Sequence, residues 1–259
     1  MISRYRPLSF LGIFTLLWAT SSSVGAFPRF YPQQISLQFP ATGDRGSPLT
    51  TRGGGTRGPN GCLVNEKEGS LSVNALTPNY SGEMVTVSAN PNLYYYIPAT
   101  TATLGELILH DDNGHEIYQT TFSLPREAGI IKVSTAPSPT LLPNQNYQWF
   151  LNIICDSQQR TEDMSFEGTL KYKKINNSVI SIDKDPLEKA KFYASQGIWV
   201  ETLDNLAKAR SQHPQDWKEL LDSAGLPELM TEPLIACCEA KALTPISTHN
   251  TVQNPTFNH

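Results

Sequence analysis

The sequence predicts an α+β protein, in which an N-terminal antiparallel β-sandwich of about seven strands precedes a small C-terminal helical module. Residues 62–175 alternate apolar and polar side chains with a period of two, which is typical of strands with one buried face. Turns rich in proline, asparagine and glycine separate these short runs, and strands at such spacing favour a sandwich. From residue 185 the apolar side chains recur at the helical period, which places the helical module at 185–241.

The first 26 residues have the pattern of a signal peptide. Arg4 and Arg6 form a short basic region, residues 8–19 are apolar, and a run of small residues follows up to an expected cut before Phe27. A membrane span needs about 20 apolar residues, and this stretch is shorter. A cleaved signal peptide at 1–26 is therefore favoured over an uncleaved anchor, and it predicts an exported protein, either periplasmic or extracellular.

The charge of the chain excludes one class of partner. The formal net charge is −4, and removal of the signal peptide leaves 18 basic and 24 acidic residues, a net charge of −6. An acidic chain without a basic run is not expected to bind nucleic acid. No later stretch is apolar enough to span a bilayer, so no transmembrane anchor is expected after cleavage of the signal.

Residues 27–61 predict a flexible or extended arm, because they are rich in proline, glycine, serine, threonine and arginine. Only QISLQF, at 34–39, has the composition of a short strand. The arm ends in TRGGGTRGPNGC at 51–62, which satisfies the glycine spacing of a phosphate-binding loop. Such a loop continues with Lys and Ser or Thr, whereas Pro59 and Asn60 follow here, so a hinge is favoured.

Two arginines in this hinge, Arg52 and Arg57, are candidate contacts with a partner. A guanidinium group forms paired hydrogen bonds with a carboxylate or phosphate, so these side chains are able to hold an anionic group. The alternative is that both are simply solvated.

The chain contains four cysteines, Cys62, Cys155, Cys237 and Cys238, and an exported protein is permitted disulfides. Four cysteines allow three pairings. Adjacent cysteines rarely pair because the ring is strained, so Cys62–Cys155 is the favoured bridge. Its loop of 93 residues would contribute roughly 4 kcal/mol in the chain-entropy model. Zinc is the alternative use of the cysteines, but no C-x-x-C pair and no histidine at ligand spacing supports it.

Six predicted stretches make up the sandwich, in the order 84–88, 93–98, the hairpin 105–124, 129–135, 147–155 and 163–174. The turn of the hairpin is Asn113-Gly114, which suits the left-handed backbone of a tight turn. In YQWFLNIIC, at 147–155, the large apolar residues and Cys155 share one face of the strand.

Three helices are predicted in the C-terminal part. Asp185 caps a helix that begins at Pro186 and ends before Gly197, and a second helix follows with Trp199 on its apolar face. Pro214 opens a third helix. A last short helix is expected at 233–240, and the tail at 242–259 is expected to be disordered.

The first two of these helices together resemble one tetratricopeptide unit, through Tyr193, Gly197, Leu203, Ala207 and Pro214. A stable array needs about three such units. This single hairpin is therefore expected to pack on the sandwich or on a partner.

Two groups of side chains are candidates for chemistry or recognition. His110, Asp111, Asp112, His115 and Glu116 cluster at the hairpin tip in a metal-like way, although turn chemistry explains the same residues and the ligand spacing of a calcium loop is missing. No known catalytic motif occurs, and no cofactor is predicted.

The strand at 93–98 carries the second group. Tyr94 and Tyr96 share one face, which suits stacking on sugars, although aromatic residues in strands are more often part of the core.

Several motifs occur in one order along the chain: GGGTRGPNGC, LYYYIP, HDDNGHEIYQTTFSLP, GII, NYQWFLNIICD and FYASQGIWVETLDNLA. Together they resemble the cyanobacterial "domain of unknown function 928" family over residues 50–227. The recurrent family positions fall on Gly54, Gly55, Thr56, Arg57, Gly58, Cys62, Trp149, Cys155, Asp156, Gly197, Ile198 and Trp199. The resemblance implies an exported cyanobacterial protein and names no activity, and Cys237 and Cys238 lie outside the family pattern.

These observations support three hypotheses of function. The first is a non-enzymatic binding or assembly module of the cell envelope, which contacts an envelope protein through the helical face around Trp199 or through the arginine arm. The second is a polysaccharide-binding module that uses Tyr94 and Tyr96. The third is an uncharacterised hydrolase or metal site built from the hairpin-tip residues His110, Asp112, His115 and Glu116.

Overall fold

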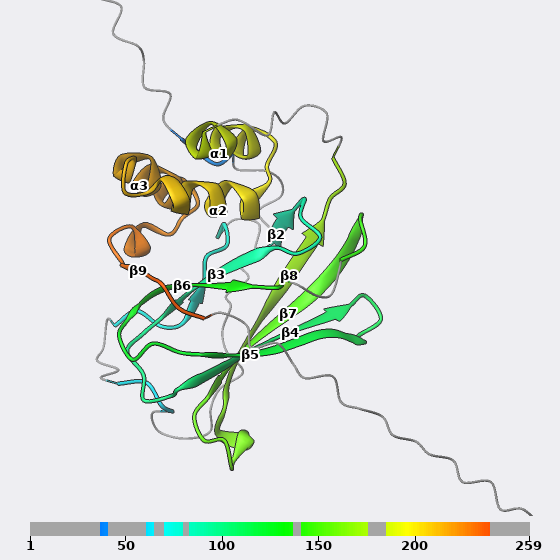
Figure 1. The fold of residues 1–259 in the computed structure, drawn as a ribbon, viewed down its shortest axis with the longest axis vertical. Helices are drawn as coiled ribbons and strands as arrows, with labels where there is room; N and C mark the ends of the chain where they lie inside the picture. Colours follow the sequence, from blue (N-terminus) through cyan, green and yellow to red (C-terminus); the bar gives the residue numbers. More distant parts are fainter. Residues whose placement is uncertain are drawn as a thin grey trace, which may run out of the picture. The chain divides into compact units, whose positions relative to one another are not determined.

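The computed structural model describes residues 37–40, 61–64, 70–79, 83–136, 141–175 and 185–238 (Figure 1). All of them belong to one compact unit, Ser36–His259. The expected signal peptide at 1–26 and the expected tail at 242–259 lie outside the described residues. Among the helices that are described, none is both long and apolar enough to cross a membrane.

Nine described strands form two sheets. The four-stranded sheet has the order β1 (Asn74–Ala75), β3 (Asn92–Ile97), β6 (Gly129–Ser134), β9 (Leu234–Ile235). The five-stranded sheet has the order β2 (Glu83–Thr86), β8 (Met164–Tyr172), β7 (Gln145–Ile154), β4 (Leu104–Asp111), β5 (Glu116–Ser123). The helical elements are η1 (Arg160–Glu162), α1 (Pro186–Ser195), α2 (Trp199–Ala209), α3 (Pro214–Ser223) and η3 (Pro227–Leu229).

The predicted α+β class is confirmed, and one detail of it is corrected. Most neighbouring strands are antiparallel, but β2 pairs with β8 and β6 pairs with β9 in parallel, so both sheets are mixed. Each parallel pair lies at the edge of its sheet, where a strand distant in the sequence is added. A purely antiparallel sandwich was expected because period-two patterning does not reveal the direction in which a strand enters its sheet.

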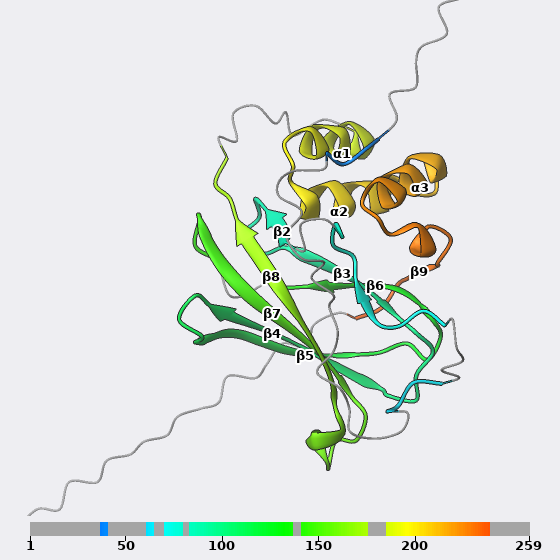
Figure 2. The same cartoon turned by 180° about the vertical axis from the view of Figure 1, so that it is seen from behind.

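The two sheets can be followed from behind in Figure 2. The core is one cluster of buried residues that come from both sheets and from α1, α2 and α3. Tyr147, Trp149, Leu151 and Ile153 of β7 are all buried, as the alternation predicts. The ring of Trp149 meets the ring of Tyr95 from β3 edge-on, with centroids 5.4 Å apart.

A glycine makes room for the Trp149 indole on the neighbouring strand. Gly168 of β8 pairs with Trp149, and a Cβ added at Gly168 would lie 2.4 Å from the indole. A side chain at this position would therefore displace the largest residue of the core.

The helices do not form a separate body, because α2 lies against β2 of one sheet and β3 of the other (Figure 1). The indole nitrogen of Trp199, at the start of α2, donates to the backbone oxygen of Leu76 at 2.5 Å. Two residues later, the Glu201 carboxylate accepts from the Thr86 hydroxyl at 2.6 Å and from the Val87 backbone at 3.1 Å. Helix α2 therefore bridges the two sheets.

A short segment of the predicted arm, residues 37–40, takes part in this packing. Leu37 and Phe39, within the predicted flexible arm, are buried. The ring of Phe39 meets Trp199 edge-on at 5.0 Å, and its backbone N–H donates to the Ser223 hydroxyl at 2.9 Å. This part of the arm, which was predicted to be flexible or extended, packs on the helices.

The prediction of a short helix at 233–240 is wrong. After η3 the chain forms β9, which pairs with β6, and the Pro233 carbonyl accepts from the Ile130 backbone at 2.7 Å. The free edge of β6 offers unpaired backbone groups, and pairing with them outweighs the weak helical preference of so short an apolar run. The C-terminal part of the helical region therefore returns to the four-stranded sheet.

Candidate functional site

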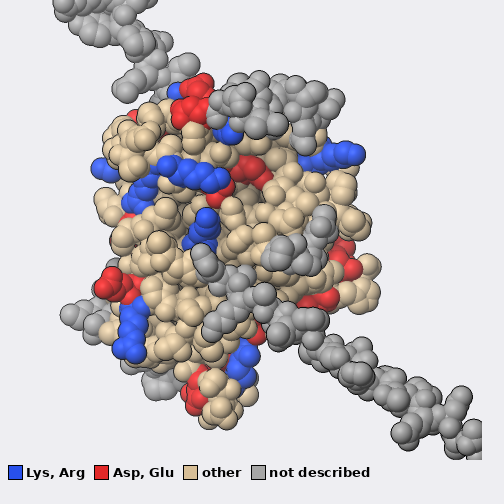
Figure 3. Space-filling model, viewed as in Figure 1, with Lys and Arg blue, Asp and Glu red and all other residues tan. Residues whose placement is uncertain are grey.

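A groove of about 740 Å³ lies between α2 and the segment at 234–238, on the outer face of the four-stranded sheet. Its floor contains Tyr94 of β3 and Lys132 of β6, which are paired in register. The lining residues are Tyr94, Ser123, Lys132, Ala207, Lys208 and the run from Leu234 to Cys238. In Figure 3 basic side chains lie over α2 and over the strands below it, with acidic side chains beside them.

A buried carboxylate organises the helix wall of the groove. Asp204 of α2 accepts hydrogen bonds from the Tyr94 hydroxyl at 2.8 Å and from the Asn92 amide at 3.1 Å. Its second oxygen pairs with the Lys208 ammonium at 2.6 Å. Burial raises the pKa of Tyr94, and the charge of Asp204 and its hydrogen bond raise it further. The Tyr94 hydroxyl therefore stays protonated and keeps donating to Asp204.

Two lysines line the groove, one of them paired with Asp204, although the chain as a whole is acidic. Among the described residues that line the groove, the charged ones are Lys132 and Lys208. The Lys208 side chain is 55% exposed despite its pairing with Asp204, and Lys132 is exposed on the outer face of β6. The opposite wall is largely apolar, with Leu234, Ile235 and a disulfide. The arrangement suits an anionic ligand that also carries apolar surface.

The disulfide in this wall joins the adjacent residues Cys237 and Cys238. The expectation that neighbouring cysteines do not pair is therefore wrong here. Cys238 is 7% exposed and has a backbone φ of 72°, in the left-handed region that residues other than glycine rarely adopt.

The three aromatic residues that were expected to contact a partner are buried. The exposed fraction is 1% for Trp199, 3% for Tyr94 and 5% for Tyr96. Helix α2 and the segment that follows η3 cover the face of β3 that carries both tyrosines, a packing that the strand pattern does not reveal. None of the three rings presents a free face for stacking, so their expected role as exposed contacts is corrected. Tyr94 reaches the groove only as part of its floor.

The hairpin tip is organised as a turn. The Asp111 carboxylate accepts from the backbone N–H groups of Asn113 and His115, both at 2.9 Å. The hydrogen bond from the His115 backbone is the main reason why the pKa of Asp111 is lowered. Gly114 has a φ of 79°, as the Asn-Gly turn predicts.

Among the other tip residues, His115 meets Asp111 through its Nδ1 atom, 3.3 Å from the carboxylate. The ring of His110 lies against Phe150 at 4.8 Å, while Asp112, His115 and Glu116 are exposed. In the described part of the chain, no three His, Cys, Asp or Glu side chains are grouped as metal ligands would be.

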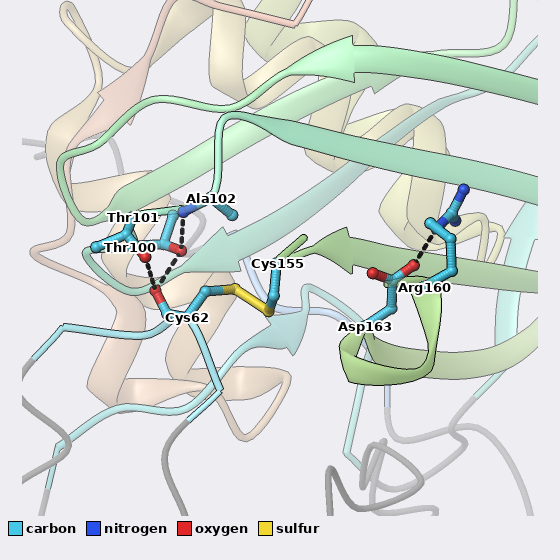
Figure 4. Close-up of a disulfide and its surroundings, with 7 residues drawn as sticks. All are labelled: Cys62, Thr100, Thr101, Ala102, Cys155, Arg160 and Asp163. Carbon is cyan, nitrogen blue, oxygen red and sulfur yellow. Dashed lines mark hydrogen bonds and ion pairs between the residues drawn. A yellow bond between two sulfur atoms is a disulfide. The ribbon is translucent and has the colours of Figure 1, made fainter. Parts of the chain in front are cut away.

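The predicted Cys62–Cys155 bridge is confirmed, and Figure 4 shows it with its neighbours. It joins the segment at 61–64 to the end of β7. The Cys62 carbonyl accepts from the Thr100 hydroxyl and from the Thr101 backbone, both at 2.8 Å. The bridge therefore anchors the beginning of the family motif region to the sandwich. Arg52 and Arg57 lie outside the described residues.

A polar cluster close to the Cys62–Cys155 bridge involves the β7–β8 connection. Glu106 of β4 is buried, and its carboxylate accepts from Gln119 and Asn152 at 2.9 Å each and from Arg160 at 2.8 Å. Arg160 also pairs with Asp163 at 2.5 Å (Figure 4). The cluster fixes the connection between β7 and β8 to the sheet through three hydrogen bonds to the Glu106 carboxylate.

The groove was not predicted from the sequence. Asp204 and Lys208 have the i, i+4 spacing of a helical ion pair, and Lys132 is the one charged residue in the run GIIKVST. These signals are common on protein surfaces. What relates these charges to one groove is the contact between Tyr94 and Asp204, which are 110 residues apart in the sequence.

A family model matches residues 52–234, which is 183 of the 259 residues, and the description of that family is Domain of Unknown Function (DUF928). The chain belongs to this family. No curated protein and no solved structure matches the chain. The DUF928 match includes the Cys62–Cys155 bridge, α2 and the first groove residue of β9, whereas Cys237 and Cys238 lie beyond it.

The hydrogen bonds of Glu106 predict a dependence of stability on pH. Burial alone would raise the pKa of Glu106, but the hydrogen bonds from Asn152, Arg160 and Gln119 outweigh it, so the pKa is lowered. An acid with a lowered pKa in the folded state stabilises the protein above its unfolded pKa of about 4.3, and this contribution is lost as the pH falls through the folded value.

We therefore expect the Glu106→Gln variant to be less stable than the wild type at pH 7 and to lose less stability on acidification to about pH 3. Urea unfolding at a series of pH values measures both effects. Glu116→Gln, at an exposed position of the same hairpin, is the matched control. Parallel pH profiles of the wild type and Glu106→Gln would contradict this assignment.

The contact between Asp204 and Tyr94 predicts a specific energetic coupling. Asp204→Ala should lower the free energy of unfolding by roughly 1–3 kcal/mol, because it leaves a buried hydroxyl without its acceptor. Adding Tyr94→Phe should restore part of the loss, since the unpaired hydroxyl is then removed as well. Urea unfolding of the two single variants and the double variant measures the coupling, with Asp222→Ala on exposed α3 surface as the control. Additive effects of the two substitutions would contradict the coupling between Asp204 and Tyr94.

Proposed function

We propose that this DUF928 protein is an exported, non-enzymatic binding module of the cell envelope, and that the groove between α2 and β9 is its binding site. The observation that carries the proposal is the composition of the groove. Two lysines face an apolar wall across a floor of sheet residues in an otherwise acidic chain. A concave surface with a few convergent charges on an apolar background is the usual form of a ligand site.

Export is supported by the N-terminal pattern and by the disulfides. The apolar stretch at 8–19 and the expected cut before Phe27 suit a secreted precursor. The chain has four cysteines, and both Cys62–Cys155 and Cys237–Cys238 are disulfides. Disulfides persist in oxidising compartments, which favours the periplasm or the cell surface over the reducing cytosol. The cyanobacterial origin implied by the family resemblance is part of the same proposal.

The favoured partner is an envelope protein that presents an acidic segment. The ammonium groups of Lys132 and Lys208 would contact its carboxylates, and the wall around Leu234 would contact its apolar side chains. The tetratricopeptide-like hairpin belongs to this proposal as well, because the end of its second helix supplies Ala207 and Lys208 to the groove.

An acidic polysaccharide is the second candidate. The exposed lysines favour it, whereas stacking on Tyr94 and Tyr96 no longer does, because both rings are buried. Such a ligand would be held by its carboxylates and by its hydroxyl groups, with Ser123 as a further polar contact.

The groove is tested by reversal of its charge. Replacing Lys132 and Lys208 together by Glu should weaken binding at least tenfold, because repulsion replaces two attractive contacts. The matched control reverses Lys171 and Lys218, which are exposed elsewhere on β8 and α3. Titration of the mature chain with poly-glutamate and with polygalacturonate, two anionic probes, measures binding and separates the two ligand classes.

The same variants are then tested in cells that make the protein. Crosslinking of the tagged chain should capture one recurring envelope protein with the wild type and the control but not with the groove variant. The captured chain should begin at Phe27. Binding that the groove variant retains in full, or a chain that keeps residues 1–26 in the cytosol, would overturn the proposal.

A further inference from the structure

The wall of the groove contains a disulfide that has no structural task apparent from its position. We propose that Cys237–Cys238 is a redox site, which a dithiol reductant opens by thiol–disulfide exchange, and that opening the ring changes the groove. The proposal uses the same groove as the proposed function, but the redox step does not depend on which ligand the groove binds.

A bridge between adjacent residues stabilises the fold little through loop closure, although it constrains the backbone locally. In the chain-entropy model a disulfide stabilises by closing a loop in the unfolded state, and the stabilisation grows with loop length. Cys62–Cys155 closes a separation of 93 residues, whereas Cys237–Cys238 joins residues that are already covalently linked. The first bridge has an obvious structural role, and the second needs another explanation.

The surroundings of the second bridge favour exchange with an incoming thiolate. Both sulfurs belong to residues that line a groove of about 740 Å³, which gives a reductant a route to them. Lys132 and Lys208 line the same groove, and nearby cations stabilise a thiolate relative to its thiol. The exposed fraction alone does not separate the two bridges, because each joins one buried and one half-buried cysteine. The groove and its charge make the difference.

The exchange is a two-electron reaction that balances with one dithiol. A thiolate of the reductant attacks the Sγ atom of Cys237, the more exposed partner, and the Cys238 sulfur leaves as a thiolate that takes up a proton. The second thiolate of the reductant then attacks the mixed disulfide and releases Cys237. The reductant ends as a disulfide, and Cys237 and Cys238 end as thiols.

Reduction should also alter the groove wall. Cys238 has a φ of 72°, a conformation that a residue with a side chain adopts only when its surroundings impose it. The ring is one such constraint, and it disappears on reduction. The wall that starts at Leu234 of β9 is then free to relax at its C-terminal end, next to the lysines that would hold an anionic ligand.

The test is a redox titration of the whole mature chain in mixtures of reduced and oxidised dithiothreitol. Free thiols are alkylated and each cysteine is located by peptide mass spectrometry. Cys237 and Cys238 should be labelled together at a ratio of reduced to oxidised reagent on the order of tenfold or more below that needed for Cys62 and Cys155. Labelling of Cys62 and Cys155 first, or of all four together, would overturn the proposal.

The role of the groove charges is tested by the rate of the same reaction. Lys132→Gln and Lys208→Gln should each slow reduction several-fold, whereas Lys171→Gln and Lys218→Gln should leave it unchanged. Equal rates in all four variants would show that the groove charges take no part in the exchange and would refute that step.

Binding of poly-glutamate and polygalacturonate by the oxidised and reduced chains completes the test. A change in affinity on reduction, reproduced by the double variant Cys237→Ser/Cys238→Ser, is expected. Selective reduction without binding of either probe would leave the redox site standing and refute the proposed function. Binding of a probe by a chain whose Cys237–Cys238 bridge resists reduction would leave the proposed function standing and refute the redox site.

Discussion

The packing of one helix across two sheets determines most of what is specific to this structure. Helix α2 contacts β2 through Glu201, β3 through Asp204, and the segment after β1 through Trp199. Burial raises the pKa of Glu201, yet hydrogen bonds from Thr86 and Val87 hold its carboxylate in place. Each contact joins residues more than 100 positions apart, so α2 closes the fold as a clamp rather than as an appended repeat.

The candidate site follows from this packing. Near the end of α2, Lys208 lines the groove together with Lys132 of β6 in its floor, and β9 returns along the edge of the sheet to supply the other wall. The two disulfides then differ in kind. Cys62–Cys155 ties a distant segment to the sandwich, while Cys237–Cys238 joins neighbours inside the groove and constrains the wall locally. The first matters for the stability of the fold and the second for the properties of the site.

The sequence predicted the features that depend on local pattern. The alternation in β7 and the Asn113-Gly114 turn follow from period and turn chemistry. The Cys62–Cys155 pairing was also predicted, although the premise behind it, that adjacent cysteines do not pair, is wrong. The sequence did not predict contacts between distant segments. Tyr94 and Tyr96 were candidates for stacking on a ligand, with the core as the alternative, because nothing local shows that α2 covers their face. β9 was expected to be helical because its partner edge on β6 lies about a hundred residues earlier.

The most direct test of this account is native-state hydrogen exchange of the whole mature chain. If α2 holds the sheets together, the slowest amides of α2, β3 and β7 should exchange through one common opening with the free energy of global unfolding. With increasing urea, the exchange free energies of all these amides should converge. Exchange of the α1 and α2 amides through a lower-energy opening, while β3 and β7 stay protected, would show an independent helical module and contradict the account.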